Sequence, residues 1–278
     1  MLSSWDVGTY AGIRVRIHWT LLALMALVGW SEWQAGRSAA AGVGFMAALF
    51  GCVLLHEYGH ALAARRYGIP TRSITLLPFG GIAALERVPT EPRRELVVAL
   101  AGPAVNVLIA LVLLPVVWLT GYGMTLLVTN IALVVFNLIP AFPMDGGRVL
   151  RALLALRTSR LRATRVAVGI GRVVAIGFAI AAFYWSPMLL LIAFVVWTQG
   201  GAELAHLEAL ASMSTLSPHD PLEKPLAIFA RTGQSEFPVL MGQQIVGVLR
   251  REQLSLAFAR FGPHMSVGSV MEPVTKAG

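Results

Sequence analysis

The sequence places two histidines four residues apart inside a long apolar segment, and such a pair could bind a metal ion. His56 and His60 flank Glu57 within a segment that runs from about Ala39 to Ala64. Residues four apart lie on one face of an α-helix, about one turn apart, so both imidazoles can reach a single Zn²⁺. Glu57 is placed to take a proton from a water molecule bound to that metal. The spacing therefore predicts a hydrolytic zinc site.

The segment around these residues is long enough to cross a bilayer, and the whole composition is that of an integral membrane protein. Of the 278 residues, 56% are hydrophobic and 13% are charged, whereas soluble domains carry about 25% charged residues. Ionisable groups at membrane depth cost free energy and usually serve a function. The net charge of +8 would suit a nucleic-acid partner. The basic residues cluster in gaps between apolar segments, as membrane topology signals do, so we expect no nucleic acid.

Asp145 is the best candidate for a third metal ligand, which a catalytic zinc usually needs beside its water. It follows Pro140 and Pro143, which interrupt helical hydrogen bonding, and it precedes Gly146 and Gly147, which permit close backbone approach. Broken backbone at membrane depth is tolerated where it lines a cavity or is buried in protein. A carboxylate in such a break suits a metal. The alternative is an aspartate at a helix end in the membrane interface.

Six apolar segments predict membrane-spanning helices. They are approximately His18–Trp33, Ala39–Ala64, Leu96–Leu119, Met124–Ile139 continuing toward Leu156, Ala163–Trp185 and Pro187–Ala205. Arginines gather before the first segment and in the gaps after the second and fourth. The last of these groups contains Arg148, Arg151, Arg157, Arg160, Arg162 and Arg165. By the positive-inside rule both termini are cytoplasmic, in a multi-pass protein of the plasma (inner) membrane that we expect to be prokaryotic.

The segment after the metal-binding motif predicts a β-hairpin. Two short apolar runs within Arg72–Leu85 surround a turn that contains Gly80 and Gly81. A peptide bond inside a transmembrane helix is shielded, so a substrate must unwind, and an edge strand could hold the unwound segment by β-augmentation. The two glycines are therefore candidate substrate contacts. An ordinary amphipathic loop explains the periodicity equally well.

Three further polar residues lie in or beside the predicted spans. Asn137, just before the proline break, could hydrogen-bond a substrate backbone or a developing oxyanion. For Asn106, an interhelical hydrogen bond is at least as good an explanation as a contact with substrate. Arg148 could stabilise an anion near the site, although the positive-inside pattern explains it as well.

From about Leu210 the sequence changes to that of a soluble module, with a helix over Pro221–Thr232, strands over Phe237–Leu240 and Gln244–Leu249, and a helix over Arg251–Arg260. We therefore predict a transmembrane domain over residues 1–209 and a tail over residues 210–278. The predicted fold class is an all-α polytopic membrane protein, with six transmembrane helices and a short membrane-associated β-hairpin, plus a small α/β cytoplasmic tail.

Taken together, the motifs resemble those of the site-2 protease family of intramembrane zinc metalloproteases. The matching elements are His56-Glu57-Tyr58-Gly59-His60, Ala101–Asn106 and the stretch from Asn137 to Gly146. The resemblance implies zinc held by His56, His60 and Asp145, with Glu57 catalytic. It also implies cleavage of membrane-tethered regulatory proteins in or near their transmembrane segments, usually after another protease has trimmed them. Both asparagines are often near the active site or substrate in this family.

The tail resembles a CBS module, which places the chain nearest the CBS-bearing branch of that family. One repeat, about Met213–Phe261, is complete, and Ser269–Val274 resembles the opening of a second, so we expect a truncated module. CBS units pair to form a cleft for adenine nucleotides. We therefore expect an adenine nucleotide at a complete pair, and a homodimer through the tail, as candidate partners beside the transmembrane substrate and the lipid bilayer.

Three other functions compete with this interpretation. A CBS-regulated membrane transporter or channel would predict internal repeats and a polar path, and neither is found. A membrane-anchored zinc protease acting on exposed protein would carry its motif just outside a span. A catalytically silent relative would not need Glu57.

Overall fold

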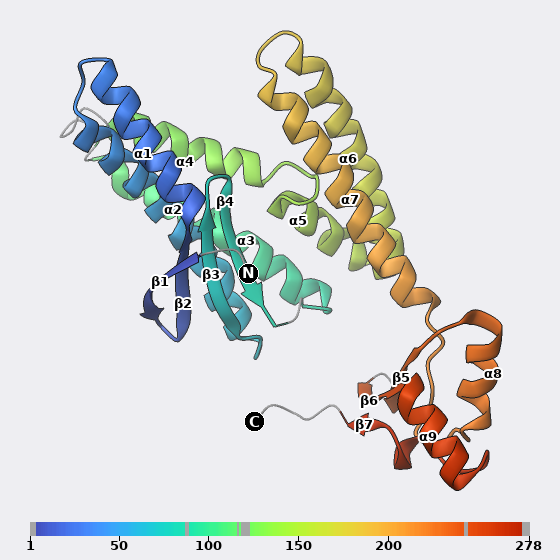
Figure 1. The fold of residues 1–278 in the computed structure, drawn as a ribbon. Helices are drawn as coiled ribbons and strands as arrows, with labels where there is room; N and C mark the ends of the chain where they lie inside the picture. The colour runs from blue at the N-terminus through green and yellow to red at the C-terminus, as the bar shows by residue number, and fades with distance from the viewer. Residues whose placement is uncertain (1–3, 87–88, 116, 118–122, 242–243, 274–278) are drawn as a thin grey trace. The chain divides into compact units, whose positions relative to one another are not determined.

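The computed structural model describes residues 4–86, 89–115, 117, 123–241 and 244–273 (Figure 1). The chain divides into two compact units, Met1–Leu204 and Ala205–Gly278. The helices that begin in the first unit are α1 (Trp19–Gln34), α2 (Ala39–Arg65), α3 (Pro92–Leu113), α4 (Gly123–Asn137), α5 (Asp145–Ala155), α6 (Arg160–Ala182) and α7 (Met188–Ser212). Its strands are β1 (Ser4–Tyr10), β2 (Ile13–His18), β3 (Thr71–Leu77) and β4 (Gly80–Leu85).

Four helices among the described residues are long and apolar enough to cross a membrane: α2, α3, α6 and α7. Helix α4 is apolar but has 15 residues, and α1 has 16. Both are shorter than the roughly 20 residues that the hydrocarbon core requires. The end of the predicted third span, at residues 116, 118 and 119, lies outside the described residues. The structure thus supports a membrane protein with four candidate spans, and the count of six stays a prediction.

A four-stranded sheet, in the order β1-β2-β3-β4, lies against α1 and α2 (Figure 1). The predicted hairpin is confirmed, because β3 and β4 pair antiparallel from Leu77↔Gly80 to Thr71↔Leu85. Strands β1 and β2 form a second hairpin, which the sequence interpretation missed, and β2 runs parallel to β3. The missed signal is the alternation of buried Ile13 and Val15 with Arg14 and Arg16, a period-two pattern. The predicted lone hairpin is therefore half of a larger sheet.

The predicted fourth span is divided in two. Helix α4 ends at Asn137, and α5 begins at Asp145 after a loop that contains both prolines. The loop folds back on the start of α5. A Cβ atom on Gly146 would lie 2.3 Å from the carbonyl oxygens of Leu138 and Ile139, so a larger residue would clash with the loop. The break thus places Asp145 at the first residue of a separate helix.

A buried cluster of ion pairs joins α5 to neighbouring helices. Arg151, which is 1% exposed, donates from Nε to Oε1 of Glu95 on α3 over 2.9 Å, and it also pairs with Glu203 on α7. Its guanidinium carbon lies 5.0 Å from the centre of the Phe142 ring. The sequence interpretation counted this arginine among the topology signals. The structure shows that it also joins three helices.

Replacing Arg151 by methionine is expected to destabilise the protein by about 3 kcal/mol, because it leaves a buried carboxylate without its main partner. This loss of stability lies at the low end of the range for removal of one partner from a buried ion pair, since Arg160 Nη1 remains 3.6 Å from Glu95. The measurement is the midpoint of thermal unfolding in detergent. The matched control is the same change at Arg157, which is exposed just after α5. Equal midpoints for the two variants would contradict this role.

The second unit contains α8 (Glu223–Thr232), β5 (Glu236–Met241), β6 (Gln244–Arg250), α9 (Arg251–Phe261) and β7 (Glu272–Pro273). Its strands form an antiparallel sheet in the order β5-β6-β7. The core includes Leu222, Phe237, Leu249 and Leu254, each at most 1% exposed. The order of helices and strands agrees with the sequence prediction. The likeness to a CBS module stays a prediction, and Val274, the last residue of the stretch that resembles the opening of a second repeat, lies outside the described residues.

Candidate metal centre

Three buried side chains from two helices bring their ligand atoms together. Nε2 of His56 and Nε2 of His60, both on α2, are 3.0 Å apart. Each lies 3.2 Å from Oδ2 of Asp145, the first residue of α5. All three ligand atoms lie within 4.8 Å of one another, and the three residues are at most 8% exposed. Two imidazole nitrogens and one carboxylate oxygen form a donor set that zinc accepts, with one position left open.

The orientation of His60 is fixed by a hydrogen bond from its other ring nitrogen. Nδ1 lies 2.7 Å from the backbone carbonyl oxygen of Val98 on α3. Because a carbonyl only accepts, Nδ1 carries a proton, so Nε2 is the ring nitrogen that can bind a metal ion. Metal-binding histidines commonly have this second contact. The arrangement therefore fits a divalent cation held by all three side chains.

Helix α3 approaches this group so closely that only glycine fits at residue 102. A Cβ atom on Gly102 would lie 2.3 Å from Nε2 of His60 and 2.7 Å from Nε2 of His56. A Cβ atom on Gly59 of α2 would lie 2.7 Å from the carbonyl oxygen of Ala101. The α3 backbone thus forms one wall of the metal centre. The sequence interpretation gave no role to Gly102, although the residue lies in one of the motifs that it quoted.

Strand β4 lies against Glu57, the predicted catalytic residue. A Cβ atom on Gly81 would lie 2.5 Å from Cγ of Glu57 and 3.2 Å from Oε1. Glu57 is half-buried on α2 between the two histidines. Gly80, also half-buried, opens the strand with φ +136°, a backbone conformation that favours glycine. The structure therefore brings Gly81 to the catalytic candidate, whereas a Cβ atom on Gly80 would have nothing within 4 Å, and the contact of either glycine with substrate stays a prediction.

The two predicted asparagines lie in different environments. Asn106 is fully buried on α3, four residues after Gly102 and so on the same helix face. Its backbone carbonyl accepts a hydrogen bond of 2.6 Å from Asn130 on α4, a residue that the sequence interpretation missed. Both polar side-chain atoms of Asn106 have no hydrogen-bond partner within the described part of the chain. Asn137 is half-buried at the end of α4. Their roles toward substrate remain predictions.

Two glycine substitutions should separate metal binding from catalysis. Gly102→Ala is expected to push the histidine nitrogens apart and to weaken metal binding by about 10–100-fold, as errors in ligand positioning do. Gly81→Ala is expected to retain the metal and to lower cleavage by up to about 100-fold, because it displaces Glu57. Metal content and cleavage rate are measured for both variants. Gly51→Ala on α2 is the matched control, since its Cβ would have nothing within 4 Å. Wild-type metal affinity in the Gly102 variant would contradict the expected clash.

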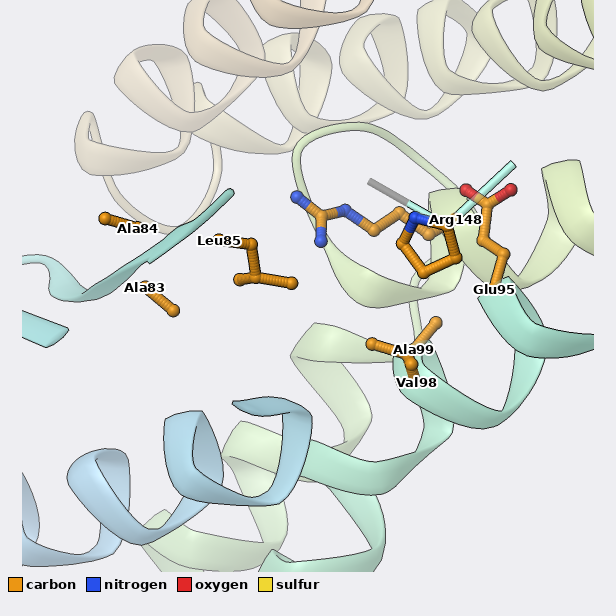
Figure 2. A pocket seen from close by; sticks show the side chains of 8 residues that line it. Ala83, Ala84, Leu85, Glu95, Val98, Ala99 and Arg148 are labelled. Carbon is orange, nitrogen blue, oxygen red and sulfur yellow. The ribbon is translucent and has the colours of Figure 1, made fainter. Parts of the chain in front are cut away.

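A cavity of about 180 Å³ lies between β4, α3 and α5 (Figure 2). Its lining consists of Ala83, Ala84, Leu85, Pro89, Glu95, Val98, Ala99 and Arg148. Val98 also supplies the carbonyl that orients His60. The cavity is therefore next to the metal centre, one helical turn before Gly102 on α3.

Comparison with known proteins gives a consistent set of similarities. The family model described as peptidase family M50 matches residues 44–125 and 118–182. The chain is 41% identical over 173 residues to a zinc metalloprotease of Methanocaldococcus jannaschii, a match that covers 59% of this chain and 50% of the relative. It is 31% identical over 262 residues to a Synechocystis protein whose zinc metalloprotease name is provisional, a match that covers 81% of this chain and 68% of that relative.

A solved structure shows a similar fold. The site-2 protease from Methanocaldococcus jannaschii superposes with a TM-score of 0.56 at 32% identity, and the match covers 73% of this chain and 95% of the solved chain. The chain spans between 41% and 68% of the length of the curated relatives it matches, and 50% of the first of them.

Proposed function

Since this chain belongs to peptidase family M50, we propose that it is an intramembrane zinc metalloprotease of the site-2 protease kind. The observation that carries the proposal is the buried convergence of His56, His60 and Asp145. The two histidines belong to a helix of 27 residues that is long and apolar enough to cross a membrane. Hydrolysis of a soluble substrate would not require a site on such a helix. The site-2 protease match and the zinc metalloprotease names of the relatives support the same reaction class.

The roles of the residues follow from their positions. The two histidines and Asp145 would hold the zinc ion, which when bound supplies Lewis-acid activation of water. Glu57 would accept a proton from the attacking water on a carboxylate oxygen. It would then donate that proton to the leaving amine nitrogen as the peptide bond breaks. The Val98 carbonyl would keep His60 in the tautomer that this arrangement needs.

The substrate that suits this site is an unwound segment in or near the transmembrane part of a membrane-tethered regulatory protein. Strand β4 is the last in the sheet order, so its outer edge is unpaired among the described strands. An extended segment could add to this edge through main-chain hydrogen bonds. Gly81 lies against Glu57, and this contact supports delivery of such a segment to the reaction centre.

The predicted topology and tail complete the proposal. Six spans with cytoplasmic termini would place β4 and the arginine-rich gaps on the cytoplasmic side of a plasma membrane. The second unit would act as a CBS-like regulatory module that binds an adenine nucleotide once paired, and it could also join two copies of the chain. A CBS-regulated transporter or channel is less well supported, because a glutamate between two clustered histidines serves hydrolysis and has no evident transport role.

The proposal is tested with the purified full chain reconstituted in lipid vesicles together with a single-span test substrate. We expect about one zinc ion per chain, cleavage that stops when a chelator removes the zinc, and recovery when zinc is restored. Full activity after verified zinc removal, or no zinc uptake even after supplementation, would contradict the proposal.

A further inference from the structure

The cavity beside β4 is lined by one charged residue, Arg148, that makes no ion pair with a described carboxylate, although its charge also acts on Glu57. Of its two charged lining residues, Glu95 is 3% exposed and is held by Arg151, with Arg160 nearby. Arg148 is exposed, and among the described residues no ion pair or hydrogen bond is recorded for its guanidinium group. Figure 2 shows that this guanidinium extends toward Leu85, whereas the carboxylate of Glu95 points away from it. The remaining lining side chains are apolar.

The free edge of β4 determines which part of a bound strand would reach this cavity. Alternate residues of β4 share one face, and on that face Gly81 lies against Glu57 while Ala83 and Leu85 pack toward the helices. A strand added beside β4 alternates in the same way. Substrate side chains two residues apart would therefore share the face that points toward the cavity, and the side chain between them would point to the opposite face.

On this basis we infer that the cavity is a specificity pocket for an acidic side chain of the substrate, which pairs with Arg148. The inference rests on the proposed function and adds to it the chemical class of one substrate residue. A planar guanidinium is well suited to a carboxylate, since it can donate two parallel hydrogen bonds. The volume of about 180 Å³ accommodates one aspartate or glutamate side chain rather than a folded helix. This size is consistent with an occupant that arrives on an extended segment.

The test is a charge swap with a substrate series. A series of single-span substrates carries glutamate, glutamine or lysine at one residue, and this residue is moved one position at a time along each side of the cleaved bond. At one of these positions, wild-type enzyme is expected to cleave the glutamate substrate about tenfold faster than its lysine counterpart, a typical effect of a partly exposed charge pair. Arg148→Glu is expected to invert that order, and Arg148→Gln to remove the preference. Substitutions at the residue immediately before or after that position should have little effect, because those side chains point to the opposite face.

Arg157→Glu is the matched control, because Arg157 is exposed on the turn after α5 and does not line the cavity. It should keep the wild-type order of substrates, and all variants should retain zinc. Wild-type cleavage without any charge preference, or an unchanged order in Arg148→Glu, would overturn the inference but not the proposed function. A uniform loss that depends on anionic lipid rather than on substrate charge would also overturn it. No wild-type cleavage of any substrate, with zinc bound, would overturn both.

Discussion

Glu57→Gln is expected to lower the rate of peptide cleavage by about 10²–10⁴-fold while zinc stays bound, which is the range for loss of a general acid–base group. Glutamine keeps the size of the side chain and its fit against Gly81, so the hairpin should not move. It cannot take a proton from water at neutral pH. The zinc ligands are separate residues, so the loss should appear in the catalytic step rather than in metal content.

Two measurements made on the same preparation separate these outcomes. Zinc content is determined on purified protein, and cleavage is followed in vesicles with substrate in excess. A matched control is Glu252→Gln on α9 of the second unit, which is exposed and lies outside the first unit that contains the metal centre. Cleavage at the wild-type rate by Glu57→Gln would show that Glu57 is not the catalytic acid–base group. Loss of zinc together with activity would instead make it part of the metal centre.

Asp145→Asn is expected to weaken zinc binding by more than about 100-fold and to reduce cleavage to background. Mutation of residues that hydrogen-bond to metal ligands already lowers metal affinity by about 10–100-fold. This change removes one of three direct ligands. Asparagine preserves the volume at the start of α5, and it is accepted at helix N-termini, so the helix itself should form. We therefore expect the variant to lose zinc coordination and to keep its fold.

Zinc affinity of this variant is measured by competition with a chelator of known affinity, and folding by the midpoint of thermal unfolding without metal. Asp6→Asn is a suitable control, since Asp6 is exposed on β1. Retention of zinc at wild-type affinity would show that a different group completes the site. A large fall in the metal-free midpoint would indicate that Asp145 acts mainly in holding α5.

The metal centre could be predicted from the sequence because its chemistry depends on short spacings. The interval between His56 and His60 requires a shared helix face, and the prolines before Asp145 require a break at membrane depth. The structure brings these groups together although the second histidine and the aspartate are 85 residues apart. The distance between His60 and Asp145 could not be predicted from the sequence, because it depends on how α5 packs against α3.

Other parts were missed because their signals resemble those of ordinary membrane helices. Gly102 looks like a packing glycine, and only the structure shows that its missing Cβ makes room for the two histidines. Arg151 follows the positive-inside pattern in sequence, yet it is buried between two carboxylates. Strand β2 has six residues, too few for its alternation to stand out before a long apolar segment. In each case the role of the residue depends on a partner that is distant in the sequence.

The most direct test of the central claim is the position of the bond that the protein breaks. Products of a single-span substrate, cleaved in vesicles by wild-type protein and not by Glu57→Gln, are identified by their masses. We predict a single major cleavage within the membrane segment or within a few residues of its cytoplasmic end, and its disappearance in the variant. Cleavage confined to a soluble part of the substrate, or the same products from Glu57→Gln, would contradict an intramembrane protease that acts through this site.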